Sequence, residues 1–534
     1  MTRSLAGSAL PAVLRRWLPA APLLACLLFA AAQAAPGASV WLDATDRPAA
    51  STREALRLLA DAAADGLDPQ DYRAAELAGH AAALAAAAGA SSSSSPAAPS
   101  QASAARAFES DLDAAMRRYL HDLRFGRVDP RTLGFRITRG TEATPDFAAL
   151  LHKAATEQRL AQAVADLRPR LPQYDRLREA LARYRALATD RTLDPLPSIA
   201  TLKPGAAYEG AAALQRRLIA LGDLPPAAPP PAGLYDTALA DGVRRFQSRH
   251  GLAVDGVIGR TTAAALNVPL EQRVRQLELA LERLRWLPDP TARPFVGINI
   301  PMFRLWAWDP TTPATAPIDM NVVVGRALNT QTPVLAEEMR YLEFRPYWNV
   351  PRSIVRNEIL PKLARDPAYL LRNDMEIVRG GGDDARPVAA SAENLELLRR
   401  GALRVRQRPG PKNSLGLVKF IFPNDANVYL HDTPATRLFG IARRDFSHGC
   451  VRVEDPVTLA QWLLRDQPRW TRERIEAAMN GASPVRVELL RPLPVILFYV
   501  TAMVMPADQA LHFAVDIYGH DARLERALAS RQRP

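Results

Sequence analysis

Cysteine is nearly absent from this chain. Its 534 residues include two cysteines, Cys26 and Cys450. If the N-terminal segment that holds Cys26 is removed on export, one thiol remains and an intramolecular disulfide is excluded. A lone thiol in an oxidising compartment is prone to oxidation, so its presence indicates a function. A buried, inert cysteine is the ordinary alternative, and the neighbours of Cys450 argue against it.

Long apolar runs are absent as well. The run over residues 17–32 is broken by Pro19 and Pro22, and the run over residues 494–504 is too short to cross a bilayer. The second run is typical of a buried strand. The sequence therefore predicts a protein that is peripheral to a membrane at most.

Acidic residues are missing from the first 34 positions, which carry three arginines ahead of the apolar run. A basic start, an apolar middle and the small-residue ending Ala32-Gln33-Ala34 predict a secretory signal peptide over residues 1–34. An uncleaved anchor is one alternative. A lipoprotein signal at Leu23-Leu24-Ala25-Cys26 is another, although the apolar run continues beyond this cysteine. We expect an exported protein of the periplasm or cell envelope.

Negative charge is in deficit over the whole chain. The formal charge is +12, and it falls to +9 without the three arginines of residues 1–34. A basic exported protein suits a polyanionic wall or a membrane surface. Nucleic acid is the other usual partner for a sequence pI of 10.0. Export argues against that partner, and the sequence carries no nucleic-acid-binding motif that we recognise.

Residues 35–205 are rich in alanine, leucine and arginine, and we find no catalytic group of residues among them. Leucines at helical spacing, such as Leu56 and Leu59, predict a helical scaffold. Residues 91–105 form a low-complexity stretch of serine, alanine and proline that we expect to be mobile.

Residues 208–267 show a self-contained three-helix pattern. Apolar residues recur at helical spacing in two segments that end at glycines: Leu214, Leu218, Leu221 and Gly222, then Leu239, Val243, Phe246 and Gly251. Thr261 or Thr262 is expected to cap a third helix that ends near Asn267. Residues 268–290 predict a connecting helix.

The motifs of this unit resemble the small peptidoglycan-binding domain. They are Leu214-Gln215 to Leu221-Gly222, Val243-Arg244-Arg245-Phe246-Gln247 and Asp255-Gly256-Val257-Ile258-Gly259. The resemblance implies that the unit binds wall polymer. The alternative is a structural module that has kept the fold and lost the ligand.

Near residue 292 the helical spacing of apolar residues ends, and segments rich in β-branched and aromatic residues begin. They cover residues 295–300, 303–308, 320–324 and 485–489. They predict a mixed, β-rich domain over residues 292–525. Residues 353–416 interrupt it with helical stretches and many arginines, which predicts a lid over a site, or else a surface insertion. The predicted fold class is multidomain α + β: a helical scaffold, a three-helix unit and a β-rich domain with an inserted helical lid.

The residues that carry chemistry lie in two segments, 427–434 and 446–453. The first segment predicts a short strand that ends at His431. The second is a glycine turn that presents Cys450, and Asp455-Pro456 then begins a helix. A cysteine needs a base or a cation nearby to become a thiolate, and His431 can be that base.

The residues around Cys450 have expected supporting roles. Backbone N–H groups of Gly449 and Cys450 are expected to stabilise an oxyanion. Arg452 is placed to hold a carboxylate or to support the same oxyanion. Ser447 is also expected to support the oxyanion or the substrate.

The sequence Ser447-His448-Gly449-Cys450-Val451-Arg452, with His431 upstream, matches the signature of the L,D-transpeptidase family. Asp432 departs from the short members of the family, which usually have glycine after the histidine. His431-Asp432-Thr433-Pro434 is instead similar to the long, multidomain members, as are residues 344–354 and 409–413. The resemblance covers roughly the last half of the chain and implies a mixed β catalytic domain with an inserted lid.

Two histidines compete for the role of base. We predict His431, because a residue two positions before the nucleophile, such as His448, usually points elsewhere and would shape the turn. Tyr429 shares its strand face with His431 and is predicted to line the pocket or to belong to the core. A zinc site of His431, His448 and Cys450 is an alternative. The family match explains all three residues without a metal, so none is predicted.

The resemblance implies a two-step acyl transfer that needs no cofactor. Cys450 attacks the diaminopimelate carbonyl at its L-centre in a tetrapeptide stem, and D-alanine leaves. The amine of a neighbouring diaminopimelate resolves the thioester into a 3→3 cross-link. Two alternatives keep the thioester but change the acceptor: water, as in a carboxypeptidase, or the amine of another protein. Two others are different classes of protein: a non-catalytic wall-binding scaffold and, less favoured, a lytic glycosidase. The resemblance also implies acylation by carbapenems.

Overall fold

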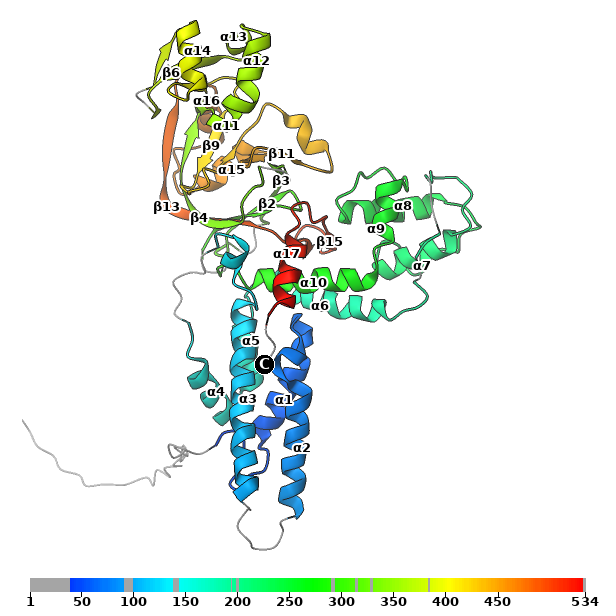
Figure 1. Cartoon of the computed structure of the whole chain (residues 1–534). Coiled ribbons are helices and arrows are strands. Elements are labelled where there is room, and N and C mark those ends of the chain that lie inside the picture. Colours follow the sequence, from blue (N-terminus) through cyan, green and yellow to red (C-terminus); the bar gives the residue numbers. More distant parts are fainter. Residues whose placement is uncertain are drawn as a thin grey trace, which may run out of the picture. The chain divides into compact units, whose positions relative to one another are not determined.

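The structure is a computed structural model (Figure 1). It describes residues 39–90, 99–137, 144–193, 195–197, 201–289, 293–312, 316–326, 330–382 and 385–531. The predicted signal peptide over residues 1–34, with Cys26, lies outside these ranges. Within them, every helix is too short or too polar to span a bilayer.

The N-terminal region is helical, as predicted. It contains α1 (Ala50–Ala60), α2 (Ala74–Ala90), α3 (Pro99–Phe125), α4 (Phe147–Thr156), α5 (Leu160–Leu167) and α6 (Pro172–Ala188), with short 3-10 turns between them. Leu59, predicted from its spacing, is fully buried in the core of this region. The stretch 91–105 was expected to be mobile, but its last seven residues begin α3, where alanine favours a helix and Ala105 is buried.

The three-helix unit forms α7 (Ala211–Leu221), α8 (Thr237–Arg249) and α9 (Arg260–Leu266). Gly222 ends α7 in the left-handed conformation at φ 88°, which glycine adopts without a steric penalty. The predicted threonine cap of α9 is wrong. Gly259 is the N-cap residue. Thr262 lies within the helix, and its buried hydroxyl accepts a hydrogen bond from the Gln247 side-chain amide over 3.2 Å. The connecting helix is α10 (Leu270–Leu284).

A mixed nine-stranded sheet forms the centre of the C-terminal region, in the order β11-β3-β12-β10-β9-β4-β13-β1-β2. Its strands are β1 (Phe295–Asn299), β2 (Arg304–Trp308), β3 (Ile318–Gly325), β4 (Leu335–Phe344), β9 (Val418–Ile421), β10 (Leu430–His431), β11 (Asp445–Ser447), β12 (Val451–Val453) and β13 (Val485–Phe498). An additional pairing of β2 with β3 closes the sheet on itself. The predicted strands are therefore present.

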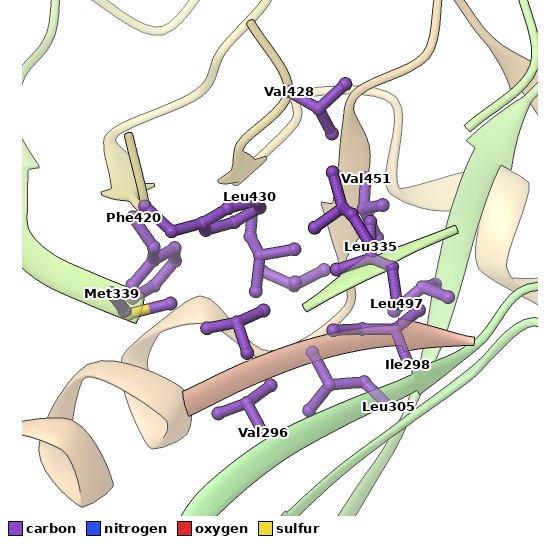
Figure 2. Close-up of a cluster of buried hydrophobic side chains, with 14 of the residues drawn as sticks. Val296, Ile298, Leu305, Leu335, Met339, Phe420, Val428, Leu430, Val451 and Leu497 are labelled. Carbon is purple, nitrogen blue, oxygen red and sulfur yellow. The ribbon is translucent and has the colours of Figure 1, made fainter. Parts of the chain in front are cut away.

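The core of this sheet is made of apolar side chains (Figure 2). Fully buried side chains come from strands far apart in the sequence: Val296, Ile298, Leu305, Leu335, Met339, Phe420, Leu430, Val451 and Leu497. The helices α15 (Pro456–Leu463), α16 (Arg472–Asn480) and α17 (His520–Ala529) add side chains to the same core. Leu430 and Val451 matter most for the site, because they anchor the two strands that carry its residues.

The insertion over residues 353–416 contains helices, as expected, and also strands, which were not expected. Its helical elements are α11 (Arg352–Ile354), a π-helical turn (Val355–Ile359), α12 (Leu360–Arg365), α13 (Tyr369–Arg372) and α14 (Ala392–Arg399). The strands β6 (Met375–Arg379), β7 (Arg386–Val388) and β8 (Arg404–Gln407) lie in the insertion, and β5 (Trp348–Asn349) lies just before it. Together they form a second sheet in the order β5-β8-β6-β7. Buried residues such as Ile377 and Val405 give it a core of its own.

Candidate active site

The register of β10 against β12 places the predicted residues on one face of the sheet. In this parallel pair, Leu430 lies opposite Val451, and His431 lies opposite Arg452. Leu430 and Val451 are fully buried in the core. Because successive side chains in a strand point to opposite faces, His431 and Arg452 face away from the core.

The same alternation extends to the residues just before each strand. Tyr429 and Cys450 precede β10 and β12, and the Val451 N–H donates to the Tyr429 carbonyl over 3.1 Å. Both side chains therefore fall on the face that carries His431 and Arg452. The two short strands and the residues just before them thus bring four of the predicted site residues to one face of the sheet.

These side chains line a cavity of about 1090 Å³. Six of the seven predicted site residues contribute to its wall: Tyr429, His431, Ser447, His448, Cys450 and Arg452. Gly449 is buried and is not part of this wall. The insertion supplies much of the remaining wall, including Ser353, Glu358 and Arg404. The glycine turn before Cys450 and the insertion therefore line the same cavity.

Hydrogen bonds fix the turn that presents Cys450. The Ser447 hydroxyl donates to the Cys450 carbonyl (2.5 Å) and accepts from the Gly449 N–H (3.1 Å). The Thr332 hydroxyl donates to the Gly449 carbonyl (2.8 Å). Gly449 has φ +112°, which a residue with a Cβ rarely adopts. Since its N–H is already bonded to Ser447, the expectation that it is free for an oxyanion is not met.

Cys450 is a half-buried free thiol. Its Sγ lies 3.9 Å from the Asn427 carbonyl. Burial raises the pKa of this thiol, while Tyr429, Lys419 and Arg452 act in the opposite direction. The thiol is therefore protonated at neutral pH, and nucleophilic attack requires a base.

His431 is in the form that a base requires. Its side chain is 4% exposed, and burial, followed by the positive charge of Arg452, lowers the pKa of His431 to about 3. The imidazole is therefore neutral at pH 7. Its Nδ1 lies 2.5 Å from the Asp432 carbonyl, so an N–H at Nδ1 leaves Nε2 as the basic nitrogen. In the described part of the chain, no hydrogen bond joins His431 to the Cys450 sulfur, although both line the cavity.

The resting pair of a thiol and a neutral imidazole predicts how alkylation of Cys450 depends on pH. We expect the rate with iodoacetamide to rise throughout the range from about pH 5 to 9, without the acidic plateau of a thiolate–imidazolium pair. Arg452 lowers the pKa of the thiol, so Arg452→Gln should raise that pKa and slow alkylation near pH 8. Mass spectrometry of quenched samples measures both effects. A rate that is constant between pH 5 and 8 would contradict this prediction.

Tyr429 contacts both proposed catalytic residues. Its ring packs edge-on against His431, with centroids 5.8 Å apart. Burial, and then the charge of Cys450 and a hydrogen bond to it, raise the pKa of Tyr429 well above its ordinary value. The phenol therefore stays protonated at neutral pH and can donate a hydrogen bond to the Cys450 sulfur. The prediction that Tyr429 lines the pocket is consistent with this position.

His448 contacts the insertion. Its Nε2 lies 2.5 Å from Glu358 Oε1 in the π-helical turn. In the ranges that the structure describes, His431, His448 and Cys450 do not meet in a group suited to a metal ion.

Lys419 was missed by the sequence analysis. It lies in β9 between the buried residues Val418 and Phe420, faces the same cavity, and its Nζ lies 4.4 Å from the centroid of the Tyr429 ring. Alternation within Val418-Lys419-Phe420 indicates that Lys419 faces away from the core. The pairing of β9 with β10, which the sequence does not reveal, is what brings it to the site.

Comparison with known proteins identifies three regions. The model of the family described as "L,D-transpeptidase catalytic domain" matches residues 293–487. The model of the family described as "Putative peptidoglycan binding domain" matches residues 208–266, and that of a "Scaffold domain" matches residues 33–181.

A protein of Haemophilus influenzae named "Putative L,D-transpeptidase" is 31% identical over 253 residues, which cover 47% of this chain and 49% of the relative. The chain thus matches about half the length of this curated relative. Two domain matches and the relative agree with the resemblance seen in the motifs. The chain therefore carries an L,D-transpeptidase catalytic domain together with a peptidoglycan-binding domain.

Proposed function

We propose that this chain cross-links peptidoglycan as a cysteine L,D-transpeptidase, with Cys450 as nucleophile and His431 as base. The observation that carries the proposal is a protonated thiol and a neutral, buried imidazole on one face of β10 and β12, in one cavity. This pair suits acyl transfer, because the imidazole can take the thiol proton as the sulfur attacks a carbonyl.

In the acylation step, His431 takes the proton from Cys450 Sγ, and the sulfur bonds to the diaminopimelate carbonyl carbon at its L-centre. The oxyanion is stabilised by the Cys450 N–H and by the positive charge of Arg452. The bond to D-alanine breaks, and His431 returns the proton to the D-alanine amine. A thioester between Cys450 and the stem remains.

In the second step, a side-chain amine of diaminopimelate on a neighbouring stem attacks the thioester. It loses a proton to His431 as the new amide forms, and the carbon–sulfur bond breaks. Cys450 recovers its proton, and the product is a 3→3 cross-link. The protein's own groups account for each proton, so no cofactor is included in the proposal.

The other parts of the chain suit work on the wall. The peptidoglycan-binding domain is proposed to hold the polymer and so raise the effective concentration of stems at the cavity. With the predicted signal peptide over residues 1–34, we propose that the protein acts in the periplasm, in wall organisation and cell shape. The insertion over residues 353–416 is proposed to act as the lid of the cavity that it lines.

Incubation with purified tetrapeptide-containing wall fragments tests the proposal. The expected products are free D-alanine and dimers joined 3→3, identified by mass spectrometry. Tripeptide without dimers would indicate that water resolves the thioester, and stems joined to a protein amine would indicate anchoring. The proposal fails if the wild-type protein releases no D-alanine and forms no adduct at Cys450.

A carbapenem is expected to acylate the protein once, at Cys450. Its strained carbonyl is an electrophile that an activated thiol should open, and the family resemblance implies poor reaction with most penicillins. Intact-protein mass spectrometry should therefore show one adduct with a carbapenem and little with ampicillin. An adduct that persists in Cys450→Ala would assign the reaction to another residue.

A further inference from the structure

His431 lies between two cations on adjacent strands. In the antiparallel pair of β9 and β10 it lies opposite Lys419, and in the parallel pair of β10 and β12 it lies opposite Arg452. All three side chains line the cavity that holds Cys450. The two cations therefore flank the proposed base on both sides, on the face of the sheet that faces away from the core.

Neither cation has an acidic partner in the described part of the chain. Lys419 has no carboxylate within 4.0 Å of its Nζ; its contact is with the face of the Tyr429 ring at 4.4 Å. Glu343 lies opposite Lys419 in β4 and attracts it without forming an ion pair. The Nε of Arg452 is buried and has no hydrogen-bond partner.

Two other lysines of the cavity wall, unlike Lys419, lie close to carboxylates. The Lys412 Nζ lies 3.7 Å from Asp374, and the Lys362 Nζ lies 4.0 Å from Glu358. Burial lowers the pKa of both Lys419 and Arg452, which reflects the cost of holding a charge without a partner. An anion in the cavity would offset this cost.

We infer that Lys419 and Arg452 form a carboxylate-binding subsite that holds the donor stem while Cys450 attacks it. The inference rests on the proposed function and deepens it. Arg452 is two residues from the nucleophile, a span of about 7 Å in a strand. The carboxylate of the departing D-alanine is three bonds from the reacting carbonyl carbon, so it is the group best placed to reach the subsite.

The donor offers a second carboxylate, at the D-centre of diaminopimelate, and the experiment separates the two. Three tetrapeptides are used: the natural acid, one with a terminal D-alaninamide and one with the D-centre carboxylate amidated. Binding to the Cys450→Ala protein is measured by calorimetry, so the result does not depend on turnover. The proposed function can then fail in the turnover assay while the subsite is still tested.

The Cys450→Ala protein is expected to bind the natural acid about 10- to 100-fold more tightly than one of the two amides, as for a hydrogen bond to a charged group. Adding Lys419→Met should reduce this preference to less than about threefold, and Lys419→Arg should retain most of it. Lys412→Met, from the same cavity wall, is the control and should leave the preference unchanged.

The identity of the amide that binds weakly tells which carboxylate the subsite holds. Equal binding of all three peptides by the Cys450→Ala protein would overturn the inference. It would also be overturned if Lys419→Met weakened binding of the acid and both amides by the same factor, because Lys419 would then support Tyr429 and the fold of the site without recognising a carboxylate.

Discussion

Cys450→Ala is expected to abolish both D-alanine release and dimer formation from tetrapeptide fragments. Cys450 is the one cysteine in the part of the chain that the structure describes, and its turn is fixed by Ser447 and Thr332. Alanine removes the sulfur and leaves the turn intact, since the hydrogen bonds that hold it involve the backbone of residues 449 and 450. The loss should therefore exceed the detection range of a mass-spectrometric assay.

Circular dichroism and the melting temperature serve as the control for this variant. Both should match the wild type, because the contacts of the thiol are weak, as in its 3.9 Å hydrogen bond to the Asn427 carbonyl. Cross-linking by Cys450→Ala at the wild-type rate would end the assignment of the nucleophile.

His431→Ala should lower the rate of acylation by about 10²- to 10⁴-fold, the usual cost of removing a general base. The thiol has a raised pKa, so little thiolate exists at neutral pH without proton transfer. The effect should therefore shrink as the pH rises and the thiol ionises without help. Single-turnover acylation, followed by mass spectrometry between about pH 6 and 9, measures it.

His448→Ala is the matched comparison, because both histidines line the cavity. We expect it to lower the acylation rate less, since the ring nitrogen Nε2 of His448 is bonded to Glu358. Glu358→Gln alters the same contact from the insertion and should have an effect similar to that of His448→Ala. If His448→Ala caused the larger loss, the roles of the two histidines would be reversed.

Local sequence patterns predicted the residues of the site well, because the two halves of the site are contiguous segments. A strand that ends at His431 and a glycine turn before Cys450 are both readable from neighbouring residues, and the Asp455 cap of the following helix is confirmed by its hydrogen bond to the Thr458 N–H at 3.0 Å. These features depend on interactions between residues close in the sequence.

Features that depend on strand pairing were not predictable in this way. Lys419 reaches the site because β9 pairs with β10, which places it opposite His431, 12 positions away. The sequence does not reveal which strands pair. The strands of the insertion were missed because they are short and rich in arginine. Thr262 shows the same limit: its burial against Gln247 is a tertiary contact that overrides its preference for a helix N-terminus.

The closure of the main sheet through β2 and β3 also affects how the chain behaves while it folds. A chain that folds next to other copies is most at risk of aggregation where strands expose unpaired backbone groups. Pairing between β2 and β3 converts two such strand edges into hydrogen-bonded neighbours. In the second sheet, the edge strand β7 carries Pro387 and Arg386, and both residue types discourage another strand from adding to it. Both features limit self-association of the chain through its strand edges.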